Sequence, residues 1–489
     1  MKTNKTYIVG LLLLLFGTTG CENKLLNLTP ESVLTTSNFY QKANDINQAV
    51  LGTYNSLQTR RQTDYLLMEV PSDNLYMSTN TTIAGSQDVD YLTANADNAL
   101  VSAFWNNTYN GIFRANSVLM NIDKPTDYAA AMKDQYIGEA KFMRALFYFD
   151  LVRMFGGVPK VTTKLSIQEA AGTAKSTADE IYALIIEDLT DAISKLPLQS
   201  GIAKGRASKG AAAGLLGKVY VYKKDYANAK TYLEQVIKNY NYTLVSDFSS
   251  LWKVATEDNS EVLFSVKYID GTNGQSLTTS YTLNGGIIGV ADRGNETALP
   301  SWSLMKKYET TDTRKAVTFQ EMWTSPTTPN ATPIWYPYVN KYAVAHTINA
   351  SGLDIPVLRY ADIILLYAET LNGLGLNAEA LVQLNTIRER AFKNSAHNYT
   401  AADVWSSALF SDKLFLERQL ELAYEHERWF DLVRSGKYMT ELTKEERLYN
   451  NITLTPVTAA LSPAVYKSIY PIPQAQIDLS PNLKQNAQY

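Results

Sequence analysis

Hydrophobic side chains recur every three or four positions over much of this 489-residue chain, which is the period of amphipathic helices. One such stripe consists of Phe104, Trp105, Thr108, Tyr109, Ile112, Asn116 and Leu119. A second helix is predicted over about 130–154, because Gly156, Gly157 and Pro159 follow it as a stop signal. A third is predicted between a capping box, Ser176 with Asp179, and Pro197. The pattern therefore predicts a mainly α fold.

Two parts of the chain resemble each other at a shift of 151 residues. The matching pairs are Ala227 with Ala378, Ala229 with Ala380, Leu233 with Leu384, Val236 with Ile387, and Gly217 with Ala368. Small residues at facing positions let antiparallel helices approach closely, and the spacing of Ala212, Leu216, Gly217 and Tyr220 is typical of a tetratricopeptide unit. We predict helix hairpins at about 208–239 and 358–391, and a third at about 134–196 with an insertion. A generic helical bundle with coincident alanines is the alternative.

Two long segments lack the helical period. Residues 62–98 and 268–357 are rich in Thr, Asn, Gly, Pro and aromatic residues, and short strand-like runs such as 262–266 occur beside them. Loops of this length in a compact protein are usually functional. We therefore expect these loops, with a few short strands, to form a ligand face on a helical scaffold.

The first residues of the chain are typical of an export signal. Lys2 and Lys5 precede an apolar run at 8–16, and the small residues 17–20 lead to Cys21, the one cysteine of the chain. The run is too short for a membrane span, and a cysteine at the cut site resembles the lipoprotein box. We expect residues 1–20 to be removed and Cys21 to be acylated, which anchors the protein to a membrane. An unmodified cysteine is the alternative.

Charge and composition limit the partners and the domain count. Removal of Lys2 and Lys5 with the signal changes the formal net charge from −3 to about −5, which argues against nucleic acid as a partner. No Pro/Ser linker or charged block divides residues 21–489, so we expect a single domain. The 32 tyrosines against 15 phenylalanines suit surfaces that recognise amphipathic ligands.

Four pairs of motifs follow one another along the chain. They are GEAKFMRALFYFDLV (138–152) with GGVP (156–159), LRYAD (358–362) with LYAE (366–369), ERQLEL (417–422) with RWFDL (428–432), and YPIP (470–473) with PNLKQN (481–486). In this order, and after a lipoprotein box, the sequence resembles the SusD/RagB family of Bacteroidetes outer-membrane nutrient-binding lipoproteins. The resemblance spans nearly the whole mature chain.

The resemblance carries expectations about fold and function. It implies four tetratricopeptide-like units and an irregular ligand face, with the protein acting as a lid over a SusC-like TonB-dependent outer-membrane transporter. The ligand would be a glycan or oligosaccharide, or a peptide in some members. Acidic residues after the lipidated cysteine mark surface export in such bacteria. The segment Glu22-Asn23-Lys24 is a weaker form of this signal, because only one of its residues is acidic. We expect a lipid-anchored protein of the outer membrane that faces outward.

No motif indicates catalysis, a metal or a cofactor. His426-Glu427 begins like the zinc motif H-E-x-x-H, but Phe430 replaces the second histidine. The segment 373–378 mimics a dinucleotide fingerprint but follows a predicted helix and not a strand. The carboxylates Glu417, Glu421 and Glu425 share a helix face, where ion pairs are favoured over glycoside hydrolysis.

A sugar-binding site needs flat aromatic surfaces for the C–H faces and polar side chains for the hydroxyl rim. The predicted loops contain both, whereas Trp105, Trp429 and Tyr148 fall inside periodic helices and are expected in the core. The candidate ligand-binding residues are Asp73, Asn74, Tyr76, Tyr281, Asn284, Trp323, Trp335, Tyr336 and Tyr338. For the alternative of a surface glycosidase, Glu321 beside Trp323 is the one suggestive carboxylate.

Overall fold

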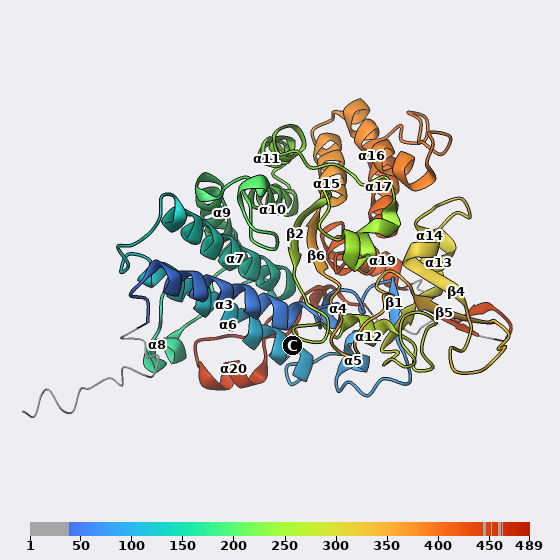
Figure 1. The fold of residues 1–489 in the computed structure, drawn as a ribbon, viewed down its shortest axis with the longest axis horizontal. Coiled ribbons are helices and arrows are strands. Elements are labelled where there is room, and N and C mark those ends of the chain that lie inside the picture. The colour runs from blue at the N-terminus through green and yellow to red at the C-terminus, as the bar shows by residue number, and fades with distance from the viewer. Residues whose placement is uncertain (1–38, 444–445, 451, 458–460, 462) are drawn as a thin grey trace, which may run out of the picture.

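Helix pairs make the scaffold of the protein. The computed structural model describes residues 39–489 apart from 444–445, 451, 458–460 and 462. The pairs are α3 (Ala43–Arg61) with α6 (Ala99–Asn121), α7 (Met132–Phe155) with α9 (Ala178–Lys195), α10 (Lys209–Tyr222) with α11 (Tyr226–Asn239), and α15 (Tyr360–Gly373) with α16 (Asn377–Phe392). They follow one another in an arc from the left to the upper right of Figure 1. The mainly α fold and the three predicted hairpins are confirmed, and α3 with α6 adds a fourth pair.

Close packing between paired helices explains the internal similarity. A Cβ atom on Gly217 of α10 would lie 2.6 Å from Cδ2 of Leu233 on α11, so only glycine permits this approach. Ala229 is fully buried on α11, and Ala368 and Ala380 are fully buried on α15 and α16. Small residues therefore stand where the two helices of each hairpin meet, as the sequence predicted.

The helix ends follow the predicted stop signals with one shift. Gly156 caps α7 with a φ of 71°. The capping box of α9 is Thr177 with Glu180, one residue after the predicted Ser176 with Asp179. Ser176 stays in the preceding loop because its backbone N–H donates to the Val158 carbonyl oxygen. The prediction of a capping box was right and its position was wrong.

The two long non-helical segments contain only short elements, as predicted. Four two-stranded antiparallel sheets are described: β1 (Leu75–Met77) with β3 (Ala298–Pro300), β2 (Val262–Val266) with β6 (Ile355–Arg359), β4 (Phe319–Trp323) with β5 (Ile334–Val339), and β7 (Leu448–Asn450) with β8 (Thr455–Val457). The short helices are α4 (Tyr65–Met68), α5 (Ser86–Asp90), α8 (Ile167–Gly172), α12 (Leu277–Tyr281), α13 (Trp302–Lys307), α14 (Lys315–Thr318), α18 (Arg428–Arg434), α19 (Tyr438–Thr443) and α20 (Gln474–Leu479). Short 3₁₀ turns cover Gln199–Gly201, Phe248–Trp252, Val254–Thr256 and Val465–Ser468. The loops of the expected ligand face thus rest on the helical scaffold at the right of Figure 1.

A buried ion-pair network surrounds the long helix α17 (Ser407–Leu422) and the turn after it. Glu417 and Glu421 are fully buried and Glu425 is 6% exposed. Their cationic partners come from four other segments: Arg314, Lys341, Arg359, Arg388 and Arg390. The predicted ion pairing is confirmed. The predicted shared helix face is wrong for Glu425, because α17 ends at Leu422 and Glu425 lies in the turn after it.

The neighbouring arginines of the same motif pair elsewhere. Arg418 binds Asp362 and Asp431. Arg428 belongs to α18 and not to α17, because α17 ends at Leu422. The arginines that pair with Glu417, Glu421 and Glu425 therefore come from other segments of the chain, which the local sequence pattern did not indicate.

The predicted signal peptide and Cys21 lie outside the described residues. Across the helices described between residues 39 and 489, we find none with both the length and the apolar character needed to cross a bilayer.

Replacing Glu421 by Gln should destabilise the fold strongly. The change leaves Arg314, Arg359 and Arg390 around a neutral amide, and loss of one partner of a buried ion pair costs about 3–5 kcal/mol. Chemical denaturation at pH 7 measures the free energy of unfolding. The control is Glu234→Gln on the surface of α11, where Glu234 pairs with Lys230 and Lys238 and the loss should stay below about 1 kcal/mol. Equal effects of the two variants would contradict the network's role.

The destabilisation caused by Glu421→Gln should depend on pH. Burial by itself would raise the pKa of Glu421, but Arg390, Arg359 and Arg314 outweigh burial and lower that pKa to about 2. A carboxylate whose folded pKa lies below its unfolded value of about 4.3 stabilises the protein fully above that value. The stability difference between wild type and Glu421→Gln should be constant from pH 7 to about 5 and shrink as the pH falls toward 2. A difference that grows on acidification would contradict the assignment.

Candidate functional site

Aromatic side chains gather on one side of the β4–β5 hairpin. Strand residues alternate between the two sides, and cross-strand partners share a side. Trp323 is opposite Ile334, and a register shift interrupts the alternation between this pair and the pair Gln320–Tyr338. Contacts show the grouping beyond the shift: the Tyr336 ring lies 6.3 Å from the Trp323 ring, and both pack against the hydrophobic cluster that contains Tyr338. We call Trp323, Ile334, Tyr336 and Tyr338 the aromatic face. Trp323 and Tyr336 are partly exposed, Ile334 is 50% exposed, and Tyr338 is 9% exposed.

Neighbouring segments hold the aromatic face in place. Tyr338 packs in a small cluster with Leu283, Ile287 and Leu299, and Tyr76 of β1 joins its edge. The Trp323 indole N–H donates to the Gly286 carbonyl oxygen at 2.8 Å. A Cβ atom on Gly285 would lie only 2.8 Å from the indole ring, so the loop backbone lies directly against the ring. The orientation of Trp323 is thus fixed in the free protein.

Glu296 joins three loops beneath the aromatic face. The residue is 4% exposed and has a φ of 45°. Its carboxylate accepts hydrogen bonds from the Tyr336 hydroxyl at 2.6 Å, the Asn80 amide at 2.9 Å and the Asn284 backbone at 3.1 Å. Burial, followed by the hydrogen bond to Glu296, raises the pKa of Tyr336, so its hydroxyl stays protonated as a donor. Glu296 is a positioning residue that sequence analysis missed, because its partners are far away in the chain.

A polar rim lies beside the aromatic face. The segment 284–295 passes against Trp323, and its side chains at Asn284, Asp292, Arg293 and Asn295 are exposed. The rim supplies hydrogen-bond donors and acceptors next to flat apolar rings. Asn284 was a sequence candidate, whereas 292–295 were missed, although they are polar residues flanking Gly294 within a glycine-rich loop.

Trp335 lies on the reverse side of the hairpin. Its ring packs on Tyr449 with a centroid distance of 4.8 Å and on Trp302 at 6.1 Å. It is partly exposed and forms an adjoining aromatic cluster with Trp302 and Tyr449. Tyr449 also packs on Tyr76 at 5.5 Å, so the two groups meet at that contact. The structure therefore brings Tyr76, Asn284, Trp323, Tyr336 and Tyr338 together and places Trp335 in the neighbouring cluster.

Asp73 is held inside the protein. Its carboxylate is 1% exposed and accepts hydrogen bonds from Arg428 at 2.6 and 2.7 Å and from Lys307 at 3.1 Å. Arg428 and Lys307 outweigh burial and keep the pKa of Asp73 far below its usual range. A carboxylate with these partners has no accessible surface for a ligand, so the geometry favours a structural role.

Asn74 and Tyr281 are buried as well. Asn74 donates to Glu69 at 2.6 Å and accepts from Gln419 at 2.8 Å. Tyr281 is 1% exposed, and its ring stacks on Tyr342 at 5.7 Å. Both side chains fill the space under the loops, which composition alone could not distinguish from the ligand face.

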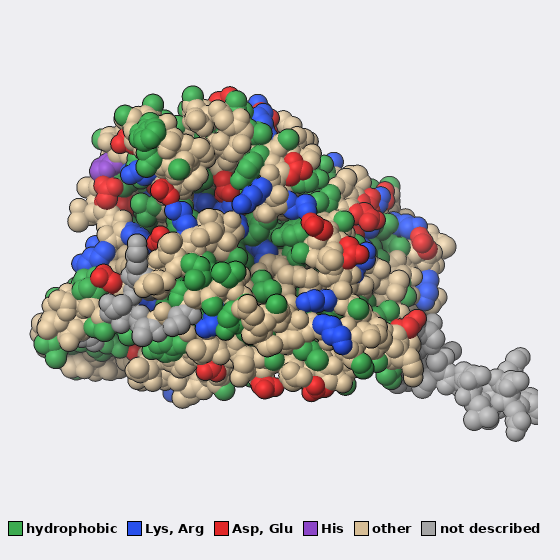
Figure 2. Space-filling view, turned by 180° about the vertical axis from the view of Figure 1, so that it is seen from behind, with side chains coloured by type: hydrophobic (Ala, Val, Ile, Leu, Met, Phe, Trp, Pro, Cys, Tyr) green, Lys and Arg blue, Asp and Glu red, His purple; other side chains and the backbone are tan. Residues whose placement is uncertain are grey.

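Two of the carboxylates near the aromatic face have partners, whereas Asp292 of the polar rim is exposed. Glu321 forms an ion pair with Lys315 at 3.0 Å, and Glu296 is occupied by the hydrogen bonds described above. Among the described residues, no group of three or more His, Cys, Asp and Glu side chains is placed to hold a metal ion. On the surface seen from behind in Figure 2, Lys and Arg side chains alternate with Asp and Glu and form no continuous basic area. The arrangement is suited to holding a neutral polar ligand.

Comparison with known proteins identifies the family. A model of the SusD family matches residues 315–489, and a model described as "Starch-binding associating with outer membrane" matches residues 24–221. The chain belongs to the SusD/RagB family. This SusD-family chain is 29% identical to SusD-like protein P2 of Formosa agariphila over 471 residues, which cover 88% of this chain and 90% of the relative. It is 25% identical to a SusD-like protein of Bacteroides ovatus over 503 residues, 92% of this chain and 85% of that one.

Solved structures of the family share the fold. A SusD homolog from Bacteroides thetaiotaomicron superimposes with a TM-score of 0.81 at 22% identity, covering 93% of this chain and 99% of that one. A structure titled "Laminarin binding SusD-like protein" gives 0.76 at 23% identity, with 92% and 100% covered. Surface glycan-binding protein A from Bacteroides fluxus gives 0.74 at 23%, with 90% and 99% covered. These SusD-like proteins confirm the helical tetratricopeptide-like scaffold.

Replacing Glu296 by Ala should loosen the polar rim and leave the helix pairs intact. The Tyr336 hydroxyl and the Asn80 amide lose an ionised acceptor, and such a loss costs about 1–3 kcal/mol. Hydrogen exchange measured by mass spectrometry should become faster in 284–295 and 334–339 but not in α10, α11, α15 or α16. Glu321→Ala, which removes only an exposed ion pair, is the control. Unchanged exchange in Glu296→Ala would show that the loops do not depend on this carboxylate.

Proposed function

We propose that this protein is a cell-surface glycan- or oligosaccharide-binding lipoprotein that passes its ligand to a SusC-like TonB-dependent outer-membrane transporter. The observation that carries the proposal is the aromatic face with its polar rim, held in position by Glu296 and the Gly285–Gly286 backbone. The matched starch-binding family description and the laminarin-binding and glycan-binding names of structural relatives support the ligand class.

The chemistry of the face fits a saccharide. A sugar ring has apolar C–H faces and a rim of hydroxyls, and the exposed parts of Trp323, Ile334 and Tyr336 would cover the former. Asn284, Asp292 and Arg293 would hydrogen-bond with the hydroxyls. Because the rings are already oriented, binding would cost little conformational entropy.

We propose that the protein does not hydrolyse its ligand. Glycosidases use two carboxyl groups about 5–9.5 Å apart on either side of the scissile bond. Here Glu321 is bound to Lys315, and Glu296 lies under the face with its oxygens occupied. Among the described residues of this face and its rim, Asp292 is therefore a single exposed carboxylate, without the second one that the reaction needs. The relatives are named as binding proteins, which supports the same conclusion.

Trp323→Ala should weaken glycan binding about tenfold or more, since loss of a central aromatic contact typically costs at least 1.4 kcal/mol. Affinity electrophoresis of the soluble 22–489 form against laminarin, starch and other neutral glycans measures the change in affinity. Trp405→Ala is the matched control, because the Trp405 indole is 76% exposed just before α17 and outside the aromatic face. Glu321→Gln should bind as wild type does.

Three results would contradict the proposal. Full affinity of Trp323→Ala, with an unchanged melting temperature, would place the ligand elsewhere. Turnover of a bound glycan that Glu321→Gln abolishes would favour a glycosidase. Binding of peptides but of no glycan in calorimetry would assign the protein to the peptide-binding members.

Cys21→Ala should leave glycan binding in solution intact and abolish retention at the outer membrane. Acylation of this residue would provide the anchor, and 17 residues separate it from Phe39, the first described residue. Fractionation of cells and surface labelling measure retention, and pull-down of the transporter from the same cells tests the partner. Membrane retention of the variant would refute the lipid anchor.

A further inference from the structure

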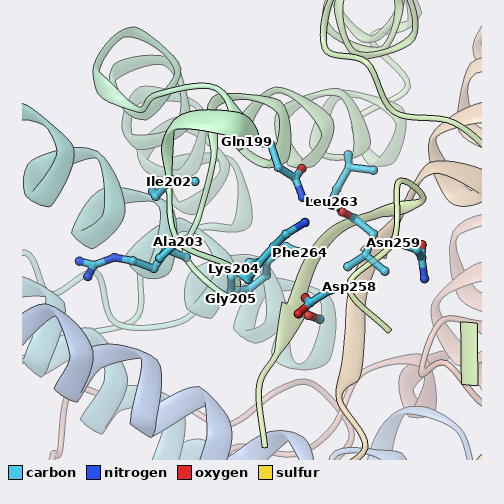
Figure 3. Close-up of a pocket in the computed structure, with 12 residues that line it drawn as sticks. Gln199, Ile202, Ala203, Lys204, Gly205, Asp258, Asn259, Leu263 and Phe264 are labelled. Atoms are coloured by element: carbon cyan, nitrogen blue, oxygen red, sulfur yellow. Dashed lines mark hydrogen bonds between the residues drawn. The ribbon is translucent and has the colours of Figure 1, made fainter. Parts of the chain in front are cut away.

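A polar groove crosses the helical scaffold away from the aromatic face. It is lined by three connections: the one between α9 and α10, the end of α11 with the residues after it, and the turn before β2. Its volume is about 440 Å³, within the range of pockets that hold small ligands. A small hollow of about 20 Å³ continues it toward β2 and shares Gln199, Lys204 and Asn259 with it. In Figure 3, the side chains of Gln199 and Lys204 extend toward the same space.

Three exposed polar side chains of this scaffold groove are available to a ligand, and Gln199 lies partly buried at its edge. The Gln199 amide nitrogen donates to the Val262 carbonyl oxygen at 3.2 Å, and its Oε1 atom is buried without a hydrogen-bond partner among the described residues. Lys204, Asn239 and Asn241 have exposed side chains, and none of the three forms a side-chain hydrogen bond or ion pair with a described residue. The groove thus offers both donors and acceptors.

An aromatic wall accompanies these groups. The Tyr240 ring is partly buried and lines the groove, while Tyr242 behind it is 5% exposed, with its hydroxyl bound to Ser208 at 3.0 Å. A flat ring beside amides and an ammonium group is the combination that saccharides require. Asp258 is paired with Lys267 at 3.0 Å, so Lys204 is the one unpaired charge among the described residues that line the groove. A single ammonium group beside amides can donate hydrogen bonds to the hydroxyls of a neutral ligand.

We infer that the scaffold groove is a second saccharide-binding site for neutral, polyhydroxylated chains. The inference rests on the proposed function, because the ligand is of the same class. The groove shares no residue with the aromatic face, and α9 and α10 lie to the left of β2 and β6 in Figure 1 whereas β4 and β5 lie at the far right. Two separate contacts on one protein would hold a long glycan more tightly than either contact alone.

Calorimetry with neutral hexasaccharides, including laminarihexaose and maltohexaose, tests the inference on the 22–489 form. The expected stoichiometry is two sugars per chain for wild type and one each for Tyr240→Ala and Trp323→Ala. Asn241→Gly is a second groove variant that spares the backbone, since Asn241 has a φ of 57°. It should weaken the second site at least threefold. Tyr232→Ala is the control, because Tyr232 lies on α11 shortly before Tyr240, stacks on Tyr220 and does not line the groove.

Hydrogen exchange locates the second sugar. In Trp323→Ala, a saturating hexasaccharide should protect 239–242 and 258–260. One sugar per chain in wild type, with no protection there, would overturn the groove site and leave the proposed function standing. Absence of binding by every hexasaccharide would overturn both. Loss of the second sugar in Tyr232→Ala would also overturn the assignment, since the effect would not be specific to the groove.

Discussion

The structure depends on carboxylates buried against arginines around α17. Glu417, Glu421 and Glu425 meet cations that come from the start of α14, from Lys341 two residues after β5, from the end of β6, and from α16. Burying such charges is costly unless every partner is present. The network is therefore satisfied only when the last helix pair and the loops of the ligand face reach α17 together. It couples the regular half of the molecule to the irregular half.

The ligand face is built outward from this network. Asp73 begins the loop before β1 and is clamped by Arg428 and Lys307, while Glu296 fastens the outer loops to Tyr336. Two hydrogen-bonded carboxylates thus hold the loops that pack against the β4–β5 hairpin and its aromatic rings. A binder that must accept and release ligand gains from rings that need no rearrangement, because little ordering entropy is lost on binding.

Local features of the sequence predicted most of the scaffold. The helical period, the small residues between paired helices and the stop signal at Gly156 each depend on neighbouring positions in the chain, so the sequence shows them directly. The candidate site was predicted only in part. Tyr76, Asn284, Trp323, Tyr336 and Tyr338 come together, but Asp73 and Asn74 are buried by Arg428 and Gln419, which lie about 350 residues later. Trp335 was grouped with its neighbours by composition, although strand alternation turns it to the reverse side. Glu296 gave no local signal, since its role arises only from long-range contacts.

We propose that a rigid helical scaffold presents a preformed aromatic face to a saccharide. A crystal structure of the 22–489 form with its tightest-binding oligosaccharide is the direct test. We expect a sugar ring packed on Trp323 or Tyr336, hydroxyls bonded to the 284–295 loop, and helix pairs unmoved from the free protein. A sugar bound only at sites that leave Trp323, Tyr336 and this loop untouched would contradict it.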